Sequence, residues 1–158
     1  MTEIQRIVDQ LNRAFAGEAW HGPAVMSILD GITAQQAAAR PLHGAHSIWE
    51  IVLHIAAWER ACRRRLAGDR AQLSGAEDWP KVAGTNEQAW GQAKEGLGQA
   101  HEELCKAVSE TDEAQLDQPI LEGMSSVYVT LHGVIQHSLY HAGQIALLKK
   151  ATSEGVRV

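Results

Sequence analysis

Apolar residues recur at helical spacing in four long stretches of the chain, and glycine, proline and polar residues separate these stretches. The pattern predicts long helices near residues 2–16, 47–67, 86–109 and 127–150. Spacings of three and four place the apolar side chains on one face of each helix, and that face must be buried against a neighbour. No stretch shows the alternation of a strand. We therefore expect residues 1–158 to form a single all-α domain, a four-helix bundle.

The connection between the first and second long helices is too long for a tight hairpin. It contains a turn at residues 20–23, a short helical segment at 24–30 and a further short turn that Thr33 can cap. A connection of roughly 30 residues predicts a long crossover that runs the length of the bundle. Residues 69–84 are polar and predict a loop, with Trp79 as an anchor.

The last predicted helix carries two histidines, His137 and His141, at the border of its apolar face. Their i,i+4 spacing places two imidazoles where both can bind one metal ion. His132 lies about 140° from His137 around the helix axis, so it cannot reach the same ion. His54 occupies the matching flank of the second long helix and is the candidate third ligand. From periodicity alone, partly buried core histidines with hydrogen-bond partners fit equally well.

Tryptophan dominates the aromatic residues, with five Trp against one Phe and two Tyr. Trp49 and Trp58 flank His54, and such bulky side chains can form the wall of a pocket. Filling the core of a bundle rich in alanine and glycine accounts for them as well.

Charge and composition exclude several classes of function. The net charge of −5 and the lack of a sustained basic face argue against a nucleic-acid partner. No apolar run approaches the roughly 20 residues of a membrane span, and the polar start of the chain is not that of a signal peptide. Cys62 and Cys105 have no CxxC spacing, which suits a reducing compartment. The simplest expectation is a cytoplasmic protein.

Two segments resemble the DinB/YfiT-like family of four-helix-bundle metalloproteins. They are HSIWEIVLHIAAWE at 46–59 and HGVIQHSLYHAGQIALLKK at 132–150, and AWHGP at 19–23 resembles one branch of the family. The family motif has one histidine near the middle of the second long helix and an HxxxHxGQ element on the last. The resemblance implies that His54, His137 and His141 bind a divalent metal ion.

Further residues are candidates for the surroundings of this site. Gln144 lies close to His137 and His141 around the helix axis and can orient an imidazole, although a solvated surface amide fits too. Trp20, His21 and His46 are candidate pocket residues, because their turns are expected over the open end of the bundle; capping or turn roles also fit. Arginines crowd the end of the second helix, where they either complement the helix dipole or bind a carboxylate-bearing substrate or thiol (Arg60, Arg63, Arg64 and Arg65).

The resemblance also implies a function. Characterised relatives include metal-dependent transferases that activate a low-molecular-weight thiol such as bacillithiol, mycothiol or glutathione, and an isomerase that uses such a thiol. A metal-dependent thiol S-transferase acting on a small-molecule substrate is therefore expected. A metal-dependent hydrolase is the alternative, but Glu59 is poorly placed around its helix to serve as the general base. A non-catalytic bundle that binds a metal or small molecule is a further alternative.

The expected cofactor is a divalent ion bound by imidazole nitrogens. Zn²⁺ and Ni²⁺ are favoured, and Fe²⁺ and Cu²⁺ also suit three histidines. A low-molecular-weight thiol is the expected second cofactor. Because many members of the family pair through their bundles, we also expect a homodimer.

Overall fold

The computed structural model of the chain describes residues 1–153, which contain six α-helices, one short 3₁₀ turn and no strand. The helices are α1 (Glu3–Phe15), α2 (Val25–Leu29), α3 (Ala34–Ala38), α4 (Ile48–Leu66), α5 (Glu87–Ser109) and α6 (Val127–Ser153). The predicted all-α class is confirmed. Residues 154–158 of the predicted domain lie outside the described residues. Within residues 1–153, no helix combines the length and apolarity needed to cross a membrane.

The long helices begin where the sequence supplies a capping side chain. Thr2 and Ser47 each form a capping box with the residue three positions later, and Asn86 accepts a hydrogen bond from the main-chain N–H of Ala89. The hydroxyl of Ser126 accepts from the N–H of Val129 in the first turn of α6. These bonds satisfy N–H groups that have no partner within the helix, which is why the predicted helix starts agree closely with the observed ones.

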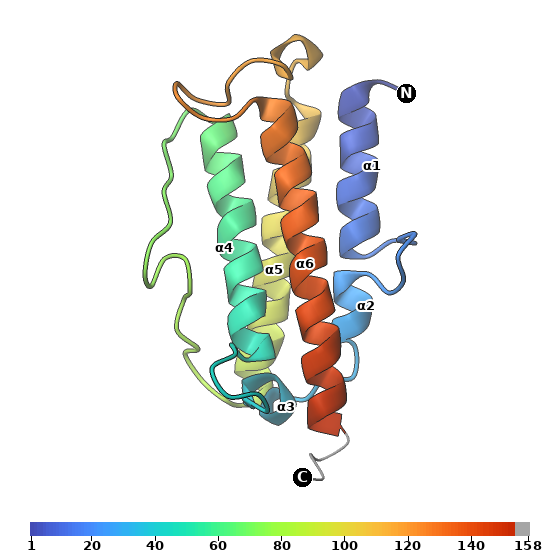
Figure 1. The fold of residues 1–158 in the computed structure, drawn as a ribbon, viewed down its shortest axis with the longest axis vertical. Coiled ribbons are helices and arrows are strands. Elements are labelled where there is room, and N and C mark those ends of the chain that lie inside the picture. Colours follow the sequence, from blue (N-terminus) through green and yellow to red (C-terminus); the bar gives the residue numbers. More distant parts are fainter. Residues whose placement is uncertain (154–158) are drawn as a thin grey trace.

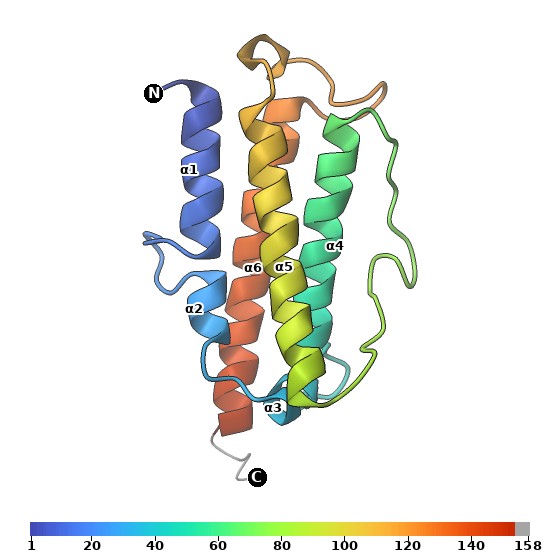
Figure 2. The same cartoon turned by 180° about the vertical axis from the view of Figure 1, so that it is seen from behind.

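The four long helices form a bundle in which α4 packs on α5 and α6, and α1 packs on the same two helices from the other side (Figures 1 and 2). Helix α1 covers only one half of the length of α6. Helix α2 continues along the other half, and α3 closes the end of the bundle where α4 begins (Figure 1). The predicted long connection between α1 and α4 therefore contains two short helices that contribute to the core. It covers only the half of the bundle that α1 leaves open, and not the whole length as predicted, because α1 is short.

A second long connection, residues 67–86, runs back along the outer side of α4 (Figure 1). It joins the end of α4 to the start of α5, so these two neighbouring helices run in the same direction (Figures 1 and 2). The sequence predicted a loop here, but its path along α4 was not predicted. This path brings Asp78 and Trp79 against the middle of α4.

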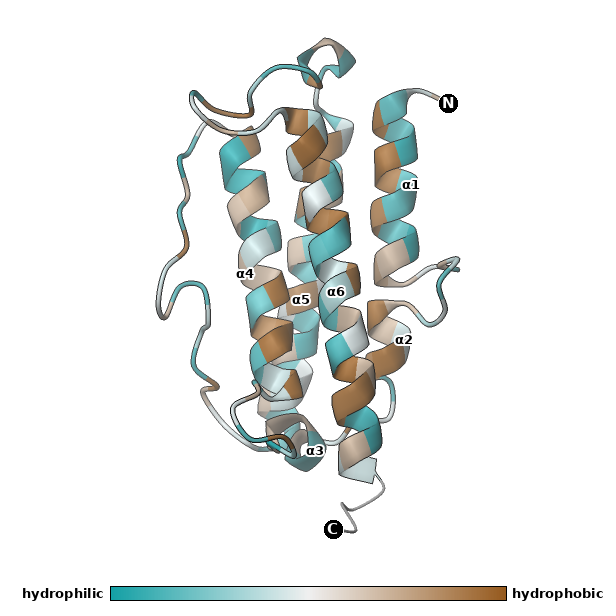
Figure 3. Cartoon of the chain, in the orientation of Figure 1, coloured by the Kyte–Doolittle hydropathy of each residue, from teal (hydrophilic) through white to brown (hydrophobic). Residues whose placement is uncertain are grey.

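A band of polar residues separates the core into two apolar clusters. One cluster contains the buried apolar residues between Ile48 and Ala56 of α4, together with Ala142, Ile145 and Leu148 of α6. The other contains Cys62, Leu104 and Leu131. Between them along the helices lie buried polar side chains, namely Glu59, His101, Ser138 and His141. In Figure 3 hydrophilic segments accordingly interrupt the hydrophobic ones near the middle of α6. Buried polar groups need partners, so this band is where a functional site is expected.

Candidate metal centre

Three imidazole rings from two helices meet in this polar band. The Nε2 atom of His137 lies 3.0 Å from Nε2 of His54 and 3.1 Å from Nε2 of His141. One nitrogen from each ring lies within 4.8 Å of the other two, in a group that could hold a metal ion. The structure thus brings together all three histidines that the sequence singled out.

Helix geometry explains why these rings converge. His137 and His141 stand one turn apart on α6, so their side chains lie on the same face. His54 faces them from α4, which packs directly on α6. The rings of His54 and His141 lie edge to face, with centroids 4.7 Å apart, and both His54 and His141 are buried.

The outer nitrogens of two of the rings have fixed hydrogen-bond partners. Nδ1 of His54 donates to the main-chain oxygen of Asp78 at 2.7 Å, and Nδ1 of His141 donates to Oε1 of Gln144 at 2.6 Å. Because a neutral imidazole carries a single proton, the Nε2 atoms of His54 and His141 are left with lone pairs. Both lone pairs point at Nε2 of His137, which can donate at most one proton. The centre therefore has more lone pairs than protons, which is the chemistry of a cation site.

The surroundings favour the neutral form of the two α6 imidazoles. Burial, together with the neighbouring His141 and His54, lowers the pKa of His137 to about 4. Burial also lowers the pKa of His141, against an opposing effect of its hydrogen bond to Gln144. At neutral pH the two α6 imidazoles therefore keep the lone pairs that a metal ion requires.

The spacing of the nitrogens fits an ion with ordinary metal–nitrogen bonds. Bonds of about 2.0–2.1 Å place two ligand nitrogens about 3.3 Å apart at a tetrahedral angle and about 2.9 Å apart at a right angle. The separations of 3.0 and 3.1 Å lie at this spacing. The three imidazole donors, the lowered pKa values of the two α6 rings and these two separations suit a divalent cation.

Asp78 is a residue of this site that the sequence did not identify. Besides its main-chain bond to His54, its carboxylate lies 3.2 Å from Nδ1 of the same ring and accepts a hydrogen bond from Nε1 of Trp58 at 2.7 Å. Asp78 thus holds the ring of His54 and the indole of Trp58 together. Its place in a polar loop without periodicity gave no signal of this role.

The face of the His54 ring is held by aromatic stacking with Trp79. The ring of Trp79 lies parallel to that of His54, with centroids 3.8 Å apart, and parallel to that of His46 at 3.5 Å. Trp79 was expected only as a loop anchor, and the structure makes it a wall of the site. Trp58 was expected near the site, and its ring centroid lies 6.0 Å from that of His137.

Two of the predicted surrounding residues do not lie at this site. Trp20 is fully exposed, and together with His21 it borders a separate depression next to Ile135 and Leu139. The turn of residues 17–24 lies between α1 and α2, whereas the three histidines lie between α4 and α6 (Figure 1). The expectation that this turn covers the site is therefore corrected. His132 also lies apart, with its ring against Tyr128 at 4.3 Å.

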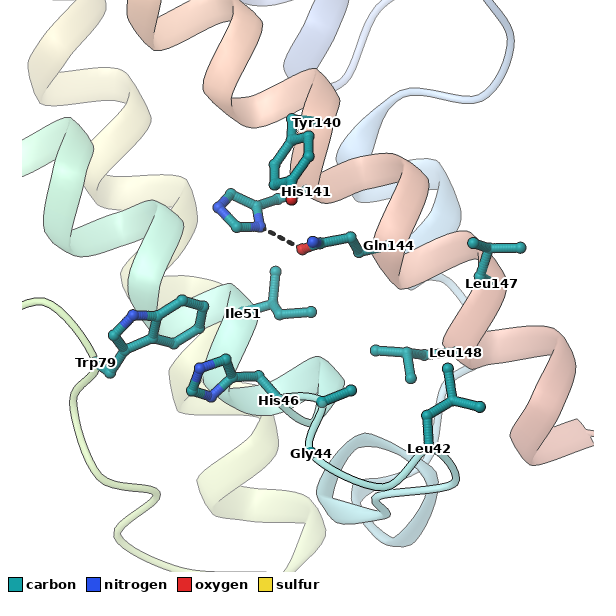
Figure 4. A pocket seen from close by; sticks show the side chains of 11 residues that line it. Leu42, Gly44, His46, Ile51, Trp79, Tyr140, His141, Gln144, Leu147 and Leu148 are labelled. Carbon is teal, nitrogen blue, oxygen red and sulfur yellow. Dashed lines mark hydrogen bonds between the residues drawn. The ribbon is translucent and has the colours of Figure 1, made fainter.

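Two cavities flank the three histidines. One, of about 470 Å³, is lined by His141, Gln144 and Tyr140 of α6, by His46 and Trp79, and by apolar side chains such as Ile51 and Leu148 (Figure 4). The other, of about 320 Å³, is lined by His137, Trp58, Cys62 and Arg65 among others. A ligand can therefore approach the histidines from an apolar side and from a side that carries a cation.

Comparison with known proteins fits this geometry. A family model described as the DinB superfamily matches residues 19–145, which include all three histidines. The chain belongs to the DinB superfamily. Membership is compatible with metal binding by the histidine group.

The fold of this DinB-superfamily chain is also found in a solved structure, the crystal structure of a conserved protein from Enterococcus faecalis. The two share a TM-score of 0.76 and 16% sequence identity, over 98% of this chain and 99% of the other. At this identity the likeness shows the fold. No curated protein matches the chain by sequence.

Proposed function

We propose that the chain is a divalent-metal protein whose three-histidine centre activates a low-molecular-weight thiol for transfer to a small electrophile. The observation that carries metal binding is the meeting of two imidazole lone pairs, on His54 and His141, at Nε2 of His137. A divalent ion bound by these nitrogens supplies Lewis acidity, which favours ionisation of a thiol near neutral pH. Zn²⁺ or Ni²⁺ is the proposed ion, because three imidazoles and this spacing suit both.

The two cavities support a reaction between two small molecules. The larger cavity is predominantly apolar and ends at His141, so it suits an apolar electrophile. The smaller cavity ends at His137 and contains Arg65, whose guanidinium lies 5.4 Å from the Trp58 ring centroid. A guanidinium binds carboxylates well, and many cellular thiols carry a carboxylate. We assign the thiol to the cavity of Arg65 and the electrophile to the cavity of His46.

The other arginines of the α4 cluster already have protein partners. Arg60 donates to the main-chain oxygen of Gly96, Arg63 pairs with Glu103, and Arg64 pairs with Asp69. Arg65 also donates to a main-chain oxygen, that of Ala71, through its Nε atom. Its two terminal nitrogens have no hydrogen bond among the described residues, which leaves them for a ligand.

The two carboxylates near the centre already have partners, and this favours thiol transfer over hydrolysis. Hydrolysis needs a general base beside the attacking water. The carboxylate of Asp78 is already held by Trp58 and His54, and that of Glu59 is buried against His101. A thiol needs no such base once the ion favours its ionisation.

Turnover with the metal present and removed tests this proposal. Metal-loaded protein is expected to transfer cysteine to monochlorobimane, where the sulfur forms a C–S bond as chloride leaves. Chelation is expected to abolish the excess rate over the solution reaction. Cysteamine lacks the carboxylate of cysteine, so its KM is expected to be higher.

Variants at two neighbouring arginines give the matched control. Arg65→Met should raise the KM for cysteine and leave that for cysteamine unchanged, whereas Arg64→Met should change neither. Ester or amide hydrolysis faster than thiol addition would replace the proposal with a hydrolase. Tight metal binding without either reaction would leave a non-catalytic metal-binding bundle.

A further inference from the structure

A second polar cluster lies on the opposite side of α4 from the three histidines, and it contains a cysteine. His101 of α5 stands between Glu59 of α4 and Asn12 of α1. Its Nδ1 lies 3.3 Å from Oε1 of Glu59, and its Nε2 lies 3.4 Å from Oδ1 of Asn12 and 3.4 Å from Sγ of Cys105. Nucleophile, imidazole and carboxylate thus follow one another in the order used to activate a thiol.

The contacts of His101 favour a proton on both ring nitrogens. Asn12 donates through Nδ2 to the main-chain oxygen of Val8, so its oxygen is the atom that faces His101. Nδ1 faces a carboxylate oxygen and Nε2 faces this amide oxygen, and both oxygens only accept. These contacts and the raised pKa of His101 favour the imidazolium, which places a positive charge beside the sulfur of Cys105.

Burial holds this arrangement in place. Glu59 is 2% exposed and His101 is 4% exposed. The second carboxylate oxygen of Glu59 has no hydrogen-bond partner among residues 1–153, so the charge of Glu59 is balanced chiefly by His101. The ring of Phe15 stacks on the imidazole, with centroids 3.8 Å apart and an angle of 6°. Although burial lowers it, the hydrogen bonds to Cys105 and Glu59 raise the pKa of His101 to about 9.

The two cysteines of the chain differ sharply in access and surroundings. Cys62 is buried, and burial raises the pKa of its thiol to about 12. Cys105 is only partly buried, at the seam between α1 and α5, and has the imidazolium as a neighbour. A partly accessible sulfur beside an imidazolium is the environment of a reactive thiol. Cys62 lies on the wall of the smaller cavity near Arg65, but its burial outweighs this cation and keeps the thiol protonated and inert.

We propose that Cys105 reacts with small hydroperoxides, with Glu59 and His101 holding a proton beside its sulfur. None of the cavities described above is lined by Cys105, so the reactant has to be small enough to meet a partly covered sulfur at the helix seam. A hydroperoxide meets this limit, and its oxygens can accept from the Nε2–H of His101. This reaction does not depend on the metal centre.

The step balances without any further reactant. The Cys105 thiolate attacks the distal oxygen of the hydroperoxide, so an S–O bond forms as the O–O bond breaks. The leaving alkoxide or hydroxide takes the Nε2 proton of His101 and departs as an alcohol or water. Sulfur loses two electrons to become a sulfenic acid, and the peroxide gains the same two.

Trapping of the sulfenic acid tests the proposal. The folded protein is treated with hydrogen peroxide at pH 7 in the presence of dimedone, and labelling at each cysteine is followed by mass spectrometry. We expect label on Cys105 and not on Cys62. His101→Gln removes the positive charge and the proton donor beside the sulfur, so labelling of Cys105 should be about fivefold slower or more.

Comparisons that do not need His101→Gln keep the test decisive if this variant folds poorly. In the unaltered protein, Cys105 should react several-fold faster than free N-acetylcysteine at the same pH, and Cys105→Ser should abolish the label. A rate equal to that of N-acetylcysteine, equal labelling of Cys62 and Cys105, or an unchanged rate in folded His101→Gln would each overturn the proposal.

Discussion

At the scale of single residues, the centre depends on groups that do not face the ion directly. Gln144 and Asp78 each bind the outer nitrogen of one histidine, which fixes the tautomer and turns the inner nitrogen towards the ion. Such partners orient a ligand and raise its basicity, and their loss weakens metal binding even though all the ligands remain.

Replacement of Gln144 by leucine is therefore expected to weaken metal affinity by about 10–100-fold. Isothermal titration of the metal-free protein with Zn²⁺ measures this change. Gln136→Leu is the matched control, because Gln136 is exposed on the same helix and has no bond to the centre. Equal affinity in the Gln144 and Gln136 variants would show that His141 needs no such partner.

The sequence revealed the ligands of this site more readily than their surroundings. Helical spacing places His54, His137 and His141 on matching flanks, so periodicity and the family motif together identify them. Asp78 and Trp79 lie in a connection without periodicity, and its path along α4 depends on contacts distant in sequence. For the same reason nothing local showed that the turn bearing Trp20 lies away from the three histidines.

At the scale of helices, the pair of Glu59 and His101 joins α4 to α5 inside the bundle. His101 follows Leu97 by four positions and precedes Leu104 by three, so helical spacing alone is enough to predict that His101 is buried on the apolar face of α5. Its hydrogen-bond partners on α4 and α1 could not be predicted from the sequence, because they depend on how the helices pack. The helix starts could be predicted because each capping side chain lies within a few residues of the N–H group that it binds.

Removal of one partner of this pair should destabilise the bundle more than removal of both. His101→Leu leaves the buried carboxylate of Glu59 without a counter-charge, which costs about 3–5 kcal/mol. The double variant Glu59→Met with His101→Leu should regain most of this loss. Urea denaturation of both variants measures the difference, and a double variant no more stable than His101→Leu would contradict the argument.

The same pair should make stability depend on pH above neutrality. Because the pKa of His101 is raised from 6.5 to about 9, its contribution to stability is complete below about pH 6.5 and disappears as the pH rises through about 9. Groups that face it are Glu59 of α4, Asn12 of α1 and Cys105 of its own helix. The Tm should fall more steeply between pH 7 and 9.5 in the unaltered protein than in the double variant. Parallel curves would contradict the assignment.

At the scale of the whole molecule, α6 presents an apolar line to solvent. Val129, Tyr140 and Leu147 are 55%, 66% and 65% exposed, and they lie within about 20° of one another around the helix axis. Exposed apolar groups in one line are a feature of interaction surfaces. A homodimer formed through this line would place a second copy beside the larger cavity, which Tyr140 and Leu147 border.

Light scattering at micromolar concentration should therefore give about twice the mass of one chain. Val129→Asp with Leu147→Asp should lower the mass to that of the monomer without loss of helicity. Gln92→Asp with Gln99→Asp on the exposed side of α5 adds the same charge elsewhere and should leave the dimer intact. A mass near 17.2 kDa for the unaltered protein would rule the dimer out.

The metal centre requires His54, His137 and His141 to act as one metal-binding unit, and the metal content of single variants tests this most directly. His54→Ala, His137→Ala, His141→Ala and His132→Ala are purified alike and analysed by elemental mass spectrometry. Each of the first three should lose the metal, because two imidazoles form an incomplete site. His132→Ala should keep it, because His132 packs on Tyr128 away from the centre. Metal lost from His132→Ala and retained in His137→Ala would contradict the account.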